Sequence, residues 1–203
     1  MARKIIALVQ ARMGSARLPG KVIKRIDGYP LIEILFKRLS NSKKIDKYIL
    51  VTTNSSEDNE LAELVEKMGF IVFRGDEKDV LDRYYQAGKK YNPEVVVRIT
   101  GDCPMIDPEL VDQIINEFEN NGTDYTSNII PPTYPDGLDV EVFSFAALKI
   151  AWEQATTEYD REHVTTYIRN NDNFIRKNVK NNIDYSKERW TVDEIDDFNF
   201  VSK

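Results

Sequence analysis

Two kinds of apolar pattern alternate along the first two-thirds of the chain. Short runs of consecutive apolar residues predict buried strands, and between them apolar residues recur every three or four positions, as on one face of a helix. The predicted strands span residues 5–9, 48–53, 70–73 and 94–100, and the predicted helices span residues 29–39, 56–69, 79–91 and 108–118. Repeated strand–helix–strand units predict an α/β fold, with a mostly parallel sheet and helices on both faces. Ligands bind such folds at the carboxyl ends of the strands.

The pattern changes after Asp124, where the predicted elements become shorter and less regular. Residues 129–137 are rich in proline and glycine and predict a loop. The predicted strands here span residues 138–143, 174–179 and 189–192, and the predicted helices span residues 145–154, residues 160–169 and a last segment from Glu194 onward. We therefore expect one domain over residues 1–203, in which a small lid and subunit-contact subdomain is built onto the sheet.

The loop after the first predicted strand carries three cations, Arg12, Arg17 and Lys21. Gly14 lets the backbone approach an anion closely, and successive backbone N–H groups, together with the Ser15 hydroxyl, can surround that anion. Guanidinium and ammonium groups add charge-assisted donors that suit phosphate. The loop has neither the Gly-Lys-Ser/Thr ending of a P-loop nor the glycine spacing of a dinucleotide-binding loop. The pattern favours a phosphate-binding site of another kind over a merely exposed basic loop.

The same loop resembles the opening loop of the sugar cytidylyltransferases, the enzymes that make CMP-activated acidic sugars. The family pattern is A-R-x-G-S-x-R-x-P-x-K, and its specified positions are filled by Ala11, Arg12, Gly14, Ser15, Arg17, Pro19 and Lys21. The branch with the greatest similarity is the spore coat polysaccharide biosynthesis type. The resemblance implies that all of these residues except Pro19 bind a nucleotide, and that Arg12 and Lys21 also take part in catalysis.

An aspartate follows the valine-rich strand predicted at residues 94–100. Asp102 comes directly after Gly101, which places its carboxylate at the same edge of the sheet as the first loop. One or two carboxylates commonly hold Mg²⁺ on nucleotide phosphates, so Asp102 is the first candidate for a metal ligand. The resembling family has the same G-D-x-P segment, which implies that Asp102 also binds the nucleotide and takes part in catalysis. The family implies a second metal ligand at Asp193. The structural alternatives are a turn or capping aspartate at position 102 and a helix N-cap at position 193.

Four further residues are candidates for binding a sugar. Asp139 and Glu141 alternate with apolar residues, so they share one face of the strand predicted at residues 138–143. Their carboxylates suit hydrogen bonds to sugar hydroxyls, and they suit the solvent face of an edge strand equally well. The resemblance favours the sugar-binding role and extends it to Glu162 and His163, for which ordinary positions on a helix surface are the alternative.

A charged stretch surrounds the start of the helix predicted at residues 79–91. Arg74 follows the third predicted strand, and the resembling family shares this stretch, which implies a contact between Arg74 and the nucleotide. Asp79 and Arg83 are four residues apart, a spacing that favours an ion pair on the helix surface.

Composition and charge narrow the class of protein. The chain has 203 residues, of which 41% are hydrophobic and 31% are charged, enough for one sizeable buried core. A net charge of −6 argues against general nucleic-acid binding. The single cysteine, Cys103, excludes an intrachain disulfide and a cysteine-rich zinc site. We see neither a secretory leader nor an apolar run approaching the roughly 20 residues of a membrane span, so we expect a cytoplasmic protein without nucleic-acid or membrane partners.

The resemblance also implies a fold and a reaction. The fold is the Rossmann-like nucleotide-diphospho-sugar transferase fold, with residues 1–124 as the nucleotide-binding half and residues 125–203 as the sugar-binding and dimerisation part that adds the last sheet strand. The reaction is Mg²⁺-dependent and converts CTP and a sugar, in this family an acidic one, into a CMP-sugar and pyrophosphate for surface polysaccharide. A homodimer is expected. The alternatives are a glycosyltransferase of the same fold that consumes a nucleotide-sugar, and a non-catalytic nucleotide-binding protein.

Overall fold

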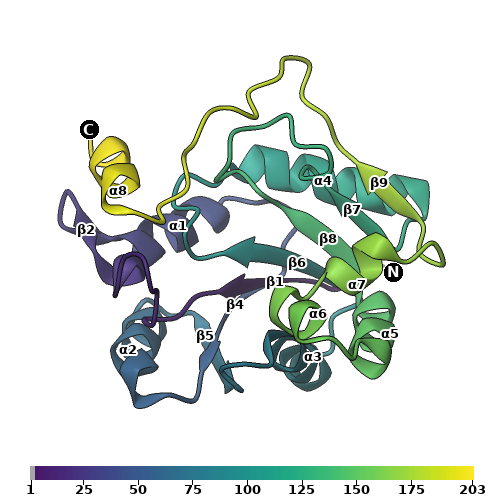
Figure 1. Ribbon diagram of the computed structural model, residues 1–203, viewed down its shortest axis with the longest axis horizontal. Helices are drawn as coiled ribbons and strands as arrows, with labels where there is room; N and C mark the ends of the chain where they lie inside the picture. The colour runs from purple at the N-terminus through teal and green to yellow at the C-terminus, as the bar shows by residue number, and fades with distance from the viewer. Residues whose placement is uncertain (1–2) are drawn as a thin grey trace.

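The computed structural model describes residues 3–203 and contains a seven-stranded sheet flanked by helices (Figure 1). The strands of this sheet are β1 (Ile5–Gln10), β4 (Lys47–Thr53), β5 (Ile71–Gly75), β6 (Val95–Thr100), β7 (Tyr125–Ser127), β8 (Glu141–Ser144) and β9 (Arg176–Asn178). Their order across the sheet is β5-β4-β1-β6-β8-β7-β9. A separate hairpin pairs β2 (Arg25–Ile26) with β3 (Tyr29–Pro30).

Strand β1 lies in the middle of the parallel part of the sheet. It pairs in parallel with β4 on one side and with β6 on the other, and β5 extends the parallel part beyond β4. The first five residues of β1 are buried, as expected for a run of consecutive apolar residues in a strand covered on both faces. Gln10 at the end of β1 lies opposite Val51 of β4 and Thr100 of β6. The segments that follow β1 and β6 therefore leave the sheet side by side.

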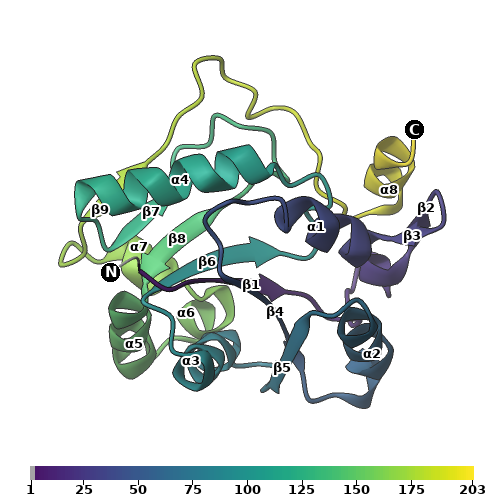
Figure 2. The same ribbon diagram turned by 180° about the vertical axis from the view of Figure 1, so that it is seen from behind.

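Helices cover both faces of the sheet. The five longest helices of the described residues are α1 (Leu31–Leu39), α2 (Asn59–Lys67), α3 (Val80–Tyr91), α4 (Pro108–Asn121) and α5 (Phe145–Gln154). Alternate residues of β1 enter two cores: Ala7 and Val9 pack in a core shared with α1, α2 and α4, and Leu8 packs in a core shared with α3 and α5. Figure 2 shows α4 on one side of the sheet and α3 with α5 on the other. The predicted α/β fold class is confirmed.

The second part of the sheet differs in detail from the prediction. Strand β8 is antiparallel to β6, β7 is antiparallel to β8, and β9 runs parallel to β7 at the edge. The three-residue strand β7 was not predicted, because so short a segment has no periodicity of its own. The strand predicted at residues 189–192 is wrong, since this segment makes only one isolated bridge, between Arg189 and Asp136.

Three other boundaries also shift. The helix predicted at residues 160–169 is two short helices, α6 (Glu158–His163) and α7 (Thr166–Asn170). They are separated at Val164, whose φ of +63° cannot continue a right-handed helix. The helix predicted from residue 29 begins at Leu31, because the two residues before it belong to the β2–β3 hairpin. The strand predicted from residue 138 begins at Glu141.

The last helix, α8 (Ile195–Val201), returns to the beginning of the chain. It lies beside β2 in Figure 1. A small apolar core joins α8 and the segment before it to the beginning of the chain. In this core Leu18, Leu31 and Val192 are buried and Phe198 packs against them. The segment before α8 is thereby held close to the loop that follows β1. Within residues 3–203, none of the helices has the length and apolar character needed to cross a membrane.

Candidate active site

Met13 anchors the loop that follows β1. Its carbonyl accepts hydrogen bonds from the backbone N–H groups of Ser15 at 2.8 Å and Gly20 at 3.0 Å, so the loop folds back on itself. Gly20 has a φ of +66°, a left-handed conformation that glycine adopts without strain. The N–H of Met13 donates to the buried carboxylate of Asp58 at 2.7 Å. These bonds fix the loop against the end of β4.

The Asp58 carboxylate beneath the loop is charged. Burial alone would raise its pKa, but hydrogen bonds from Met13, Thr53 and Thr52 hold the pKa below its usual value. A buried carboxylate whose oxygens are all engaged in this way gives the loop a rigid support.

A pocket of about 320 Å³ lies between this loop and the carboxyl end of β6. Eight of the residues predicted for the nucleotide and metal line it, namely Ala11, Arg12, Gly14, Ser15, Arg17, Lys21, Asp102 and Asp193. The two loops can approach because residue 101 is glycine: a Cβ there would lie 2.6 Å from the Cβ of Ala11. The individual roles of these residues stay predictions, but the fold brings all of them to one place.

Lys21 lies between the two aspartates predicted to hold a metal. Its Nζ atom is 3.1 Å from Oδ2 of Asp102 and 2.6 Å from Oδ1 of Asp193, and only 8% of the residue is exposed. Burial would raise the pKa of Asp102, but the Lys21 ammonium and a hydrogen bond from Thr100 lower it below its usual value. Asp193 also contacts Arg17, at 2.9 Å. Two carboxylates far apart in the sequence therefore converge on one point of the pocket.

Asp193 reaches the pocket without a regular strand. The Val192 N–H donates to the Asp102 carbonyl at 2.8 Å, and the Thr191 hydroxyl donates to the same carbonyl at 3.2 Å. The N-cap of α8 is Glu194, which forms a capping box with Asp197, so the alternative of an N-cap at position 193 is wrong. The structure leaves the Asp193 side chain facing the cations of the first loop.

The donor set at this point suits Mg²⁺. Within the described residues, no group of three or more histidine, cysteine, aspartate or glutamate side chains is arranged to hold a metal. Mg²⁺ in nucleotide enzymes is typically held by one or two carboxylates together with substrate phosphates, and Asp102 and Asp193 supply such a pair. An ion at this point would take the place that the Lys21 ammonium has in the structure.

A second pocket, of about 190 Å³, contains three of the four residues predicted for the sugar. Its lining consists of Arg98, Thr100, Ile129, Asp139, Glu141, His163 and Arg169. Thr100 also lines the first pocket, so the two pockets adjoin at the end of β6.

The two carboxylates of the second pocket differ in their surroundings. Glu141 is 3% exposed and accepts hydrogen bonds from Arg98, from the Tyr125 hydroxyl at 2.6 Å and from the Thr165 hydroxyl at 2.5 Å. The solvent-face alternative for Glu141 is therefore wrong. Burial raises the pKa of Asp139 to about 7, helped by the carboxylates of Asp136, Glu141 and Asp102. Glu141 is thus held by protein donors, whereas Asp139 is poised to gain or lose a proton near neutral pH.

Glu162 and His163 lie at the end of α6, beside a third cavity of about 850 Å³ that both residues line. The His163 ring packs on the Tyr159 ring with 4.4 Å between centroids, and both side chains are exposed. Of Glu162 and His163, only His163 also lines the second pocket. The contact of Glu162 and His163 with a sugar stays a prediction.

Arg74 does not line any of these three cavities. Its guanidinium donates to the carbonyls of Thr53 at 2.8 Å and Ser55 at 2.6 Å and to the Asn59 side chain at 2.7 Å. In the structure Arg74 fixes the link between β4 and α2, and its position does not support the nucleotide contact predicted for it.

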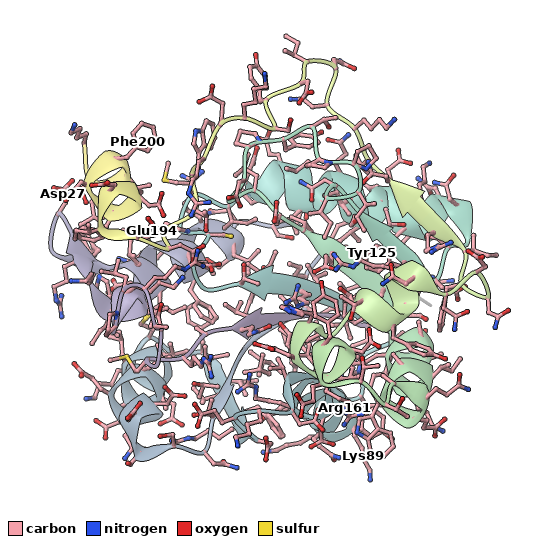
Figure 3. The ribbon with its side chains drawn as sticks, viewed as in Figure 1. Asp27, Lys89, Tyr125, Arg161, Glu194 and Phe200 are labelled. Carbon is pink, nitrogen blue, oxygen red and sulfur yellow. The ribbon has the colours of Figure 1, made fainter. Side chains whose placement is uncertain are left out.

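The ion pair predicted between Asp79 and Arg83 is wrong. Asp79 pairs instead with Arg161, whose Nη2 lies 2.5 Å from Oδ2, and it caps α3 by accepting the Asp82 N–H at 2.8 Å. The Arg161 side chain bridges α6 and α3 in this way (Figure 3). Arg83 turns inward and is 1% exposed, in the wall of the first pocket.

Sequence reasoning also missed Asp58 and Arg98. Arg98 stands in the middle of the valine-rich strand β6 and pairs with Glu141. A charged residue inside an otherwise apolar strand is a signal that could have been used, because a buried charge requires a partner. Asp58 gave no such signal, since an acidic residue before a helix is an ordinary capping pattern.

Comparison with known proteins adds an independent observation. The family model described as Cytidylyltransferase matches residues 6–198. The solved structure of a cytidylyltransferase from Leptospira borgpetersenii is similar with a TM-score of 0.95 and 34% sequence identity, covering 98% of this chain and 85% of that chain.

Two curated proteins are similar over most of their length. An uncharacterized protein of Methanocaldococcus jannaschii is 46% identical over 200 residues, which is 96% of this chain and 80% of the relative. The spore coat polysaccharide biosynthesis protein SpsF of Bacillus subtilis is 40% identical over 171 residues, which is 82% of this chain and 70% of the relative.

Proposed function

The chain belongs to the cytidylyltransferase family, and from that premise we propose that it transfers the cytidylyl group of CTP to a sugar hydroxyl with the help of Mg²⁺. The family resemblance and the nucleotide-diphospho-sugar transferase fold predicted from the sequence are confirmed, and the chain is a nucleotidyltransferase. In the proposed reaction the hydroxyl oxygen bonds to the α-phosphorus and the bond from that phosphorus to pyrophosphate breaks. The hydroxyl proton is released, and the products are a CMP-sugar and pyrophosphate.

One observation carries the proposal: the cations of the first loop and the carboxylates of Asp102 and Asp193 line the same pocket. A triphosphate needs several positive groups, and a leaving pyrophosphate gains negative charge that Arg12, Arg17 and Lys21 would stabilise. In the structure Arg17 and Lys21 contact Asp193, so a bound triphosphate would compete with this carboxylate for both cations.

Asp102 and Asp193 are the residues that would hold Mg²⁺. Their carboxylates converge on the Lys21 ammonium, which shows that a cation at that point is within reach of both. When bound, Mg²⁺ would polarise the α-phosphate and offset its charge. The chain's own contribution is to fix the two carboxylates through the hydrogen bonds between residues 191–192 and the Asp102 carbonyl.

The second pocket is the proposed sugar site, because it meets the first at Thr100. Glu141 already neutralises Arg98, which leaves Arg169 as the lining guanidinium available to a substrate carboxylate. An acidic sugar fits this arrangement, since guanidinium and carboxylate form paired, charge-assisted hydrogen bonds. Similarity to a protein named for spore coat polysaccharide biosynthesis supports a product destined for surface polysaccharide.

The test is pyrophosphate release from CTP and Mg²⁺ in the presence of acidic sugars, with the neutral analogue of each sugar as its control. We expect release with an acidic sugar and CTP, and much less with ATP, GTP or UTP. Release of a nucleoside diphosphate from a nucleotide-sugar would instead support the glycosyltransferase alternative. Nucleotide binding without turnover of any acidic or neutral sugar would support the non-catalytic alternative.

A further inference from the structure

Arg83 is a buried cation for which the described residues supply no hydrogen-bond or ion-pair partner. It lies in the first turns of α3 and is 1% exposed. Among the described residues, its Nε and Nη1 atoms have no hydrogen-bond acceptor. Burial lowers the pKa of the guanidinium, and the nearby Arg12 lowers it further. An uncompensated buried charge is costly, so proteins retain one where a ligand supplies the missing acceptor.

Arg83 is also held in place where a ligand would bind. It lines both the first pocket and the third cavity, and Gln10 and Arg12 are the other residues common to the two. A Cβ at Gly75 would lie 3.0 Å from the Arg83 Cγ, so the glycine lets the arginine stem pass close to the end of β5. The guanidinium is therefore confined to the pocket wall.

The position of Arg83 along the pocket indicates which part of a nucleotide it meets. Helix α3 packs on β4 and β5, whereas Asp102 follows β6, and β1 lies between them. Lys21 contacts Asp102, and Arg17 contacts Asp193, so the cations for the phosphates gather around the two aspartates. A nucleotide whose phosphates lie there would extend its nucleoside toward the Arg83 end.

We infer that Arg83 recognises the base of the nucleotide by donating hydrogen bonds to the acceptors O2 and N3 of cytosine. This inference rests on the proposed function. A neutral base suits a nine-tenths buried site better than terminal phosphates, which remain hydrated and bound to metal. Uracil carries a donor at N3, so a guanidinium that faces this edge selects cytosine. Arg83 is accordingly a specificity-determining residue that the family's loop motif does not contain.

The test compares the binding of CMP, UMP and pyrophosphate, measured by calorimetry. The variants are Arg83→Met and Arg83→Lys, and Lys89→Met is the matched control because Lys89 is an exposed cation on the same helix (Figure 3). We expect Arg83→Met to weaken CMP binding about tenfold to a hundredfold and to abolish the preference for CMP over UMP. Pyrophosphate binding should be unchanged, and Lys89→Met should match the wild-type protein throughout.

Other outcomes overturn the inference. Equal losses of CMP and pyrophosphate affinity would make Arg83 a phosphate ligand, and an unchanged CMP preference would remove it from the site. The melting temperature should not fall in Arg83→Met, because no protein partner is lost. If it does fall, Arg83→Lys decides: loss of the preference for CMP over UMP supports the inference, and a retained preference overturns it. Wild-type protein that binds no CMP would overturn the proposed function as well, whereas wild-type CMP binding that Arg83→Met leaves intact would overturn this inference alone.

Discussion

The Asp102 carboxylate is the single group on which the proposed reaction depends most. Asp102→Asn keeps the size of the side chain and can still accept a hydrogen bond from Lys21, so the fold should persist. Loss of its charge should lower the rate of pyrophosphate release about a hundredfold to a thousandfold. Asp193→Asn should have a similar effect, and the double variant should lose less than the product of the two, since both act on one ion.

The control for these variants is Asp172→Asn, because the Asp172 side chain is 98% exposed and lines neither the first nor the second pocket. Melting temperatures report folding in parallel. Turnover close to wild type in well-folded Asp102→Asn would refute the assignment of this carboxylate to the metal.

Asp139 makes a prediction about pH. Its folded-state pKa of about 7 lies above the ordinary aspartate value of 3.8, so the folded protein keeps a proton that the unfolded chain loses. Stability contributed by this group therefore falls as the pH rises from about 4 to about 7. Asp139→Asn removes the penalty and should raise the melting temperature at pH 8, with little effect at pH 4. A gain of equal size at both values would show that the effect of the substitution is not electrostatic.

At the level of elements, the approach of the β1 loop to the β6 loop depends on Gly101. Gly101→Ala would place a Cβ 2.6 Å from the Ala11 Cβ and should lower the free energy of unfolding by about 1–3 kcal/mol. The companion change Ala11→Gly removes the opposing methyl group and should restore part of the loss. Urea denaturation of the two single variants and the double variant measures this coupling; additive losses would mean that the two loops are not in contact.

Sequence patterns predicted the elements whose own residues show a regular apolar pattern. Consecutive apolar residues located β1, and helical spacing located α5 with its observed limits, Phe145–Gln154. The patterns failed where tertiary contacts decide. Two hydrogen bonds to the Asp102 carbonyl, rather than strand pairing, position the segment before Asp193. A positive φ at Val164 divides a helix whose apolar spacing continues through it.

The same distinction applies to the candidate site. The loop motif carried its own signal in sequence, so its members were predicted together and the structure brings them to one pocket. The positions of the Arg83 and Arg74 side chains depend instead on contacts between elements that are separate in the sequence. An arginine four residues after an aspartate favours a surface pair, and only the packing of α3 against β5 shows that Arg83 turns inward while Arg161 takes its place on Asp79.

For the whole molecule we propose a homodimer that uses the part of the chain after Asp124. Among residues 3–203, eight of the nine exposed large apolar side chains lie in this part, including Ile130, Ile175 and Ile183. Large apolar side chains at the surface favour association where they come together in a patch. Light scattering at high micromolar concentration should give twice the chain mass, and Ile175→Glu or Ile183→Glu should shift it toward the monomer. A monomer mass for the unmodified protein would contradict the proposal.

The ammonium of Lys21, held between Asp102 and Asp193, gives the free protein an internal counterion. If those carboxylates hold the metal as proposed, an incoming ion must displace this ammonium, whereas a triphosphate attracts it away. Ion and nucleotide should therefore bind with positive cooperativity, and thermodynamic linkage requires each to raise the affinity of the other by the same factor. Mn²⁺ titrations followed by electron paramagnetic resonance should show weak binding to the free protein and tight binding with CTP. The Lys21 ammonium would then occupy the metal site of the free protein and leave it when the nucleotide binds.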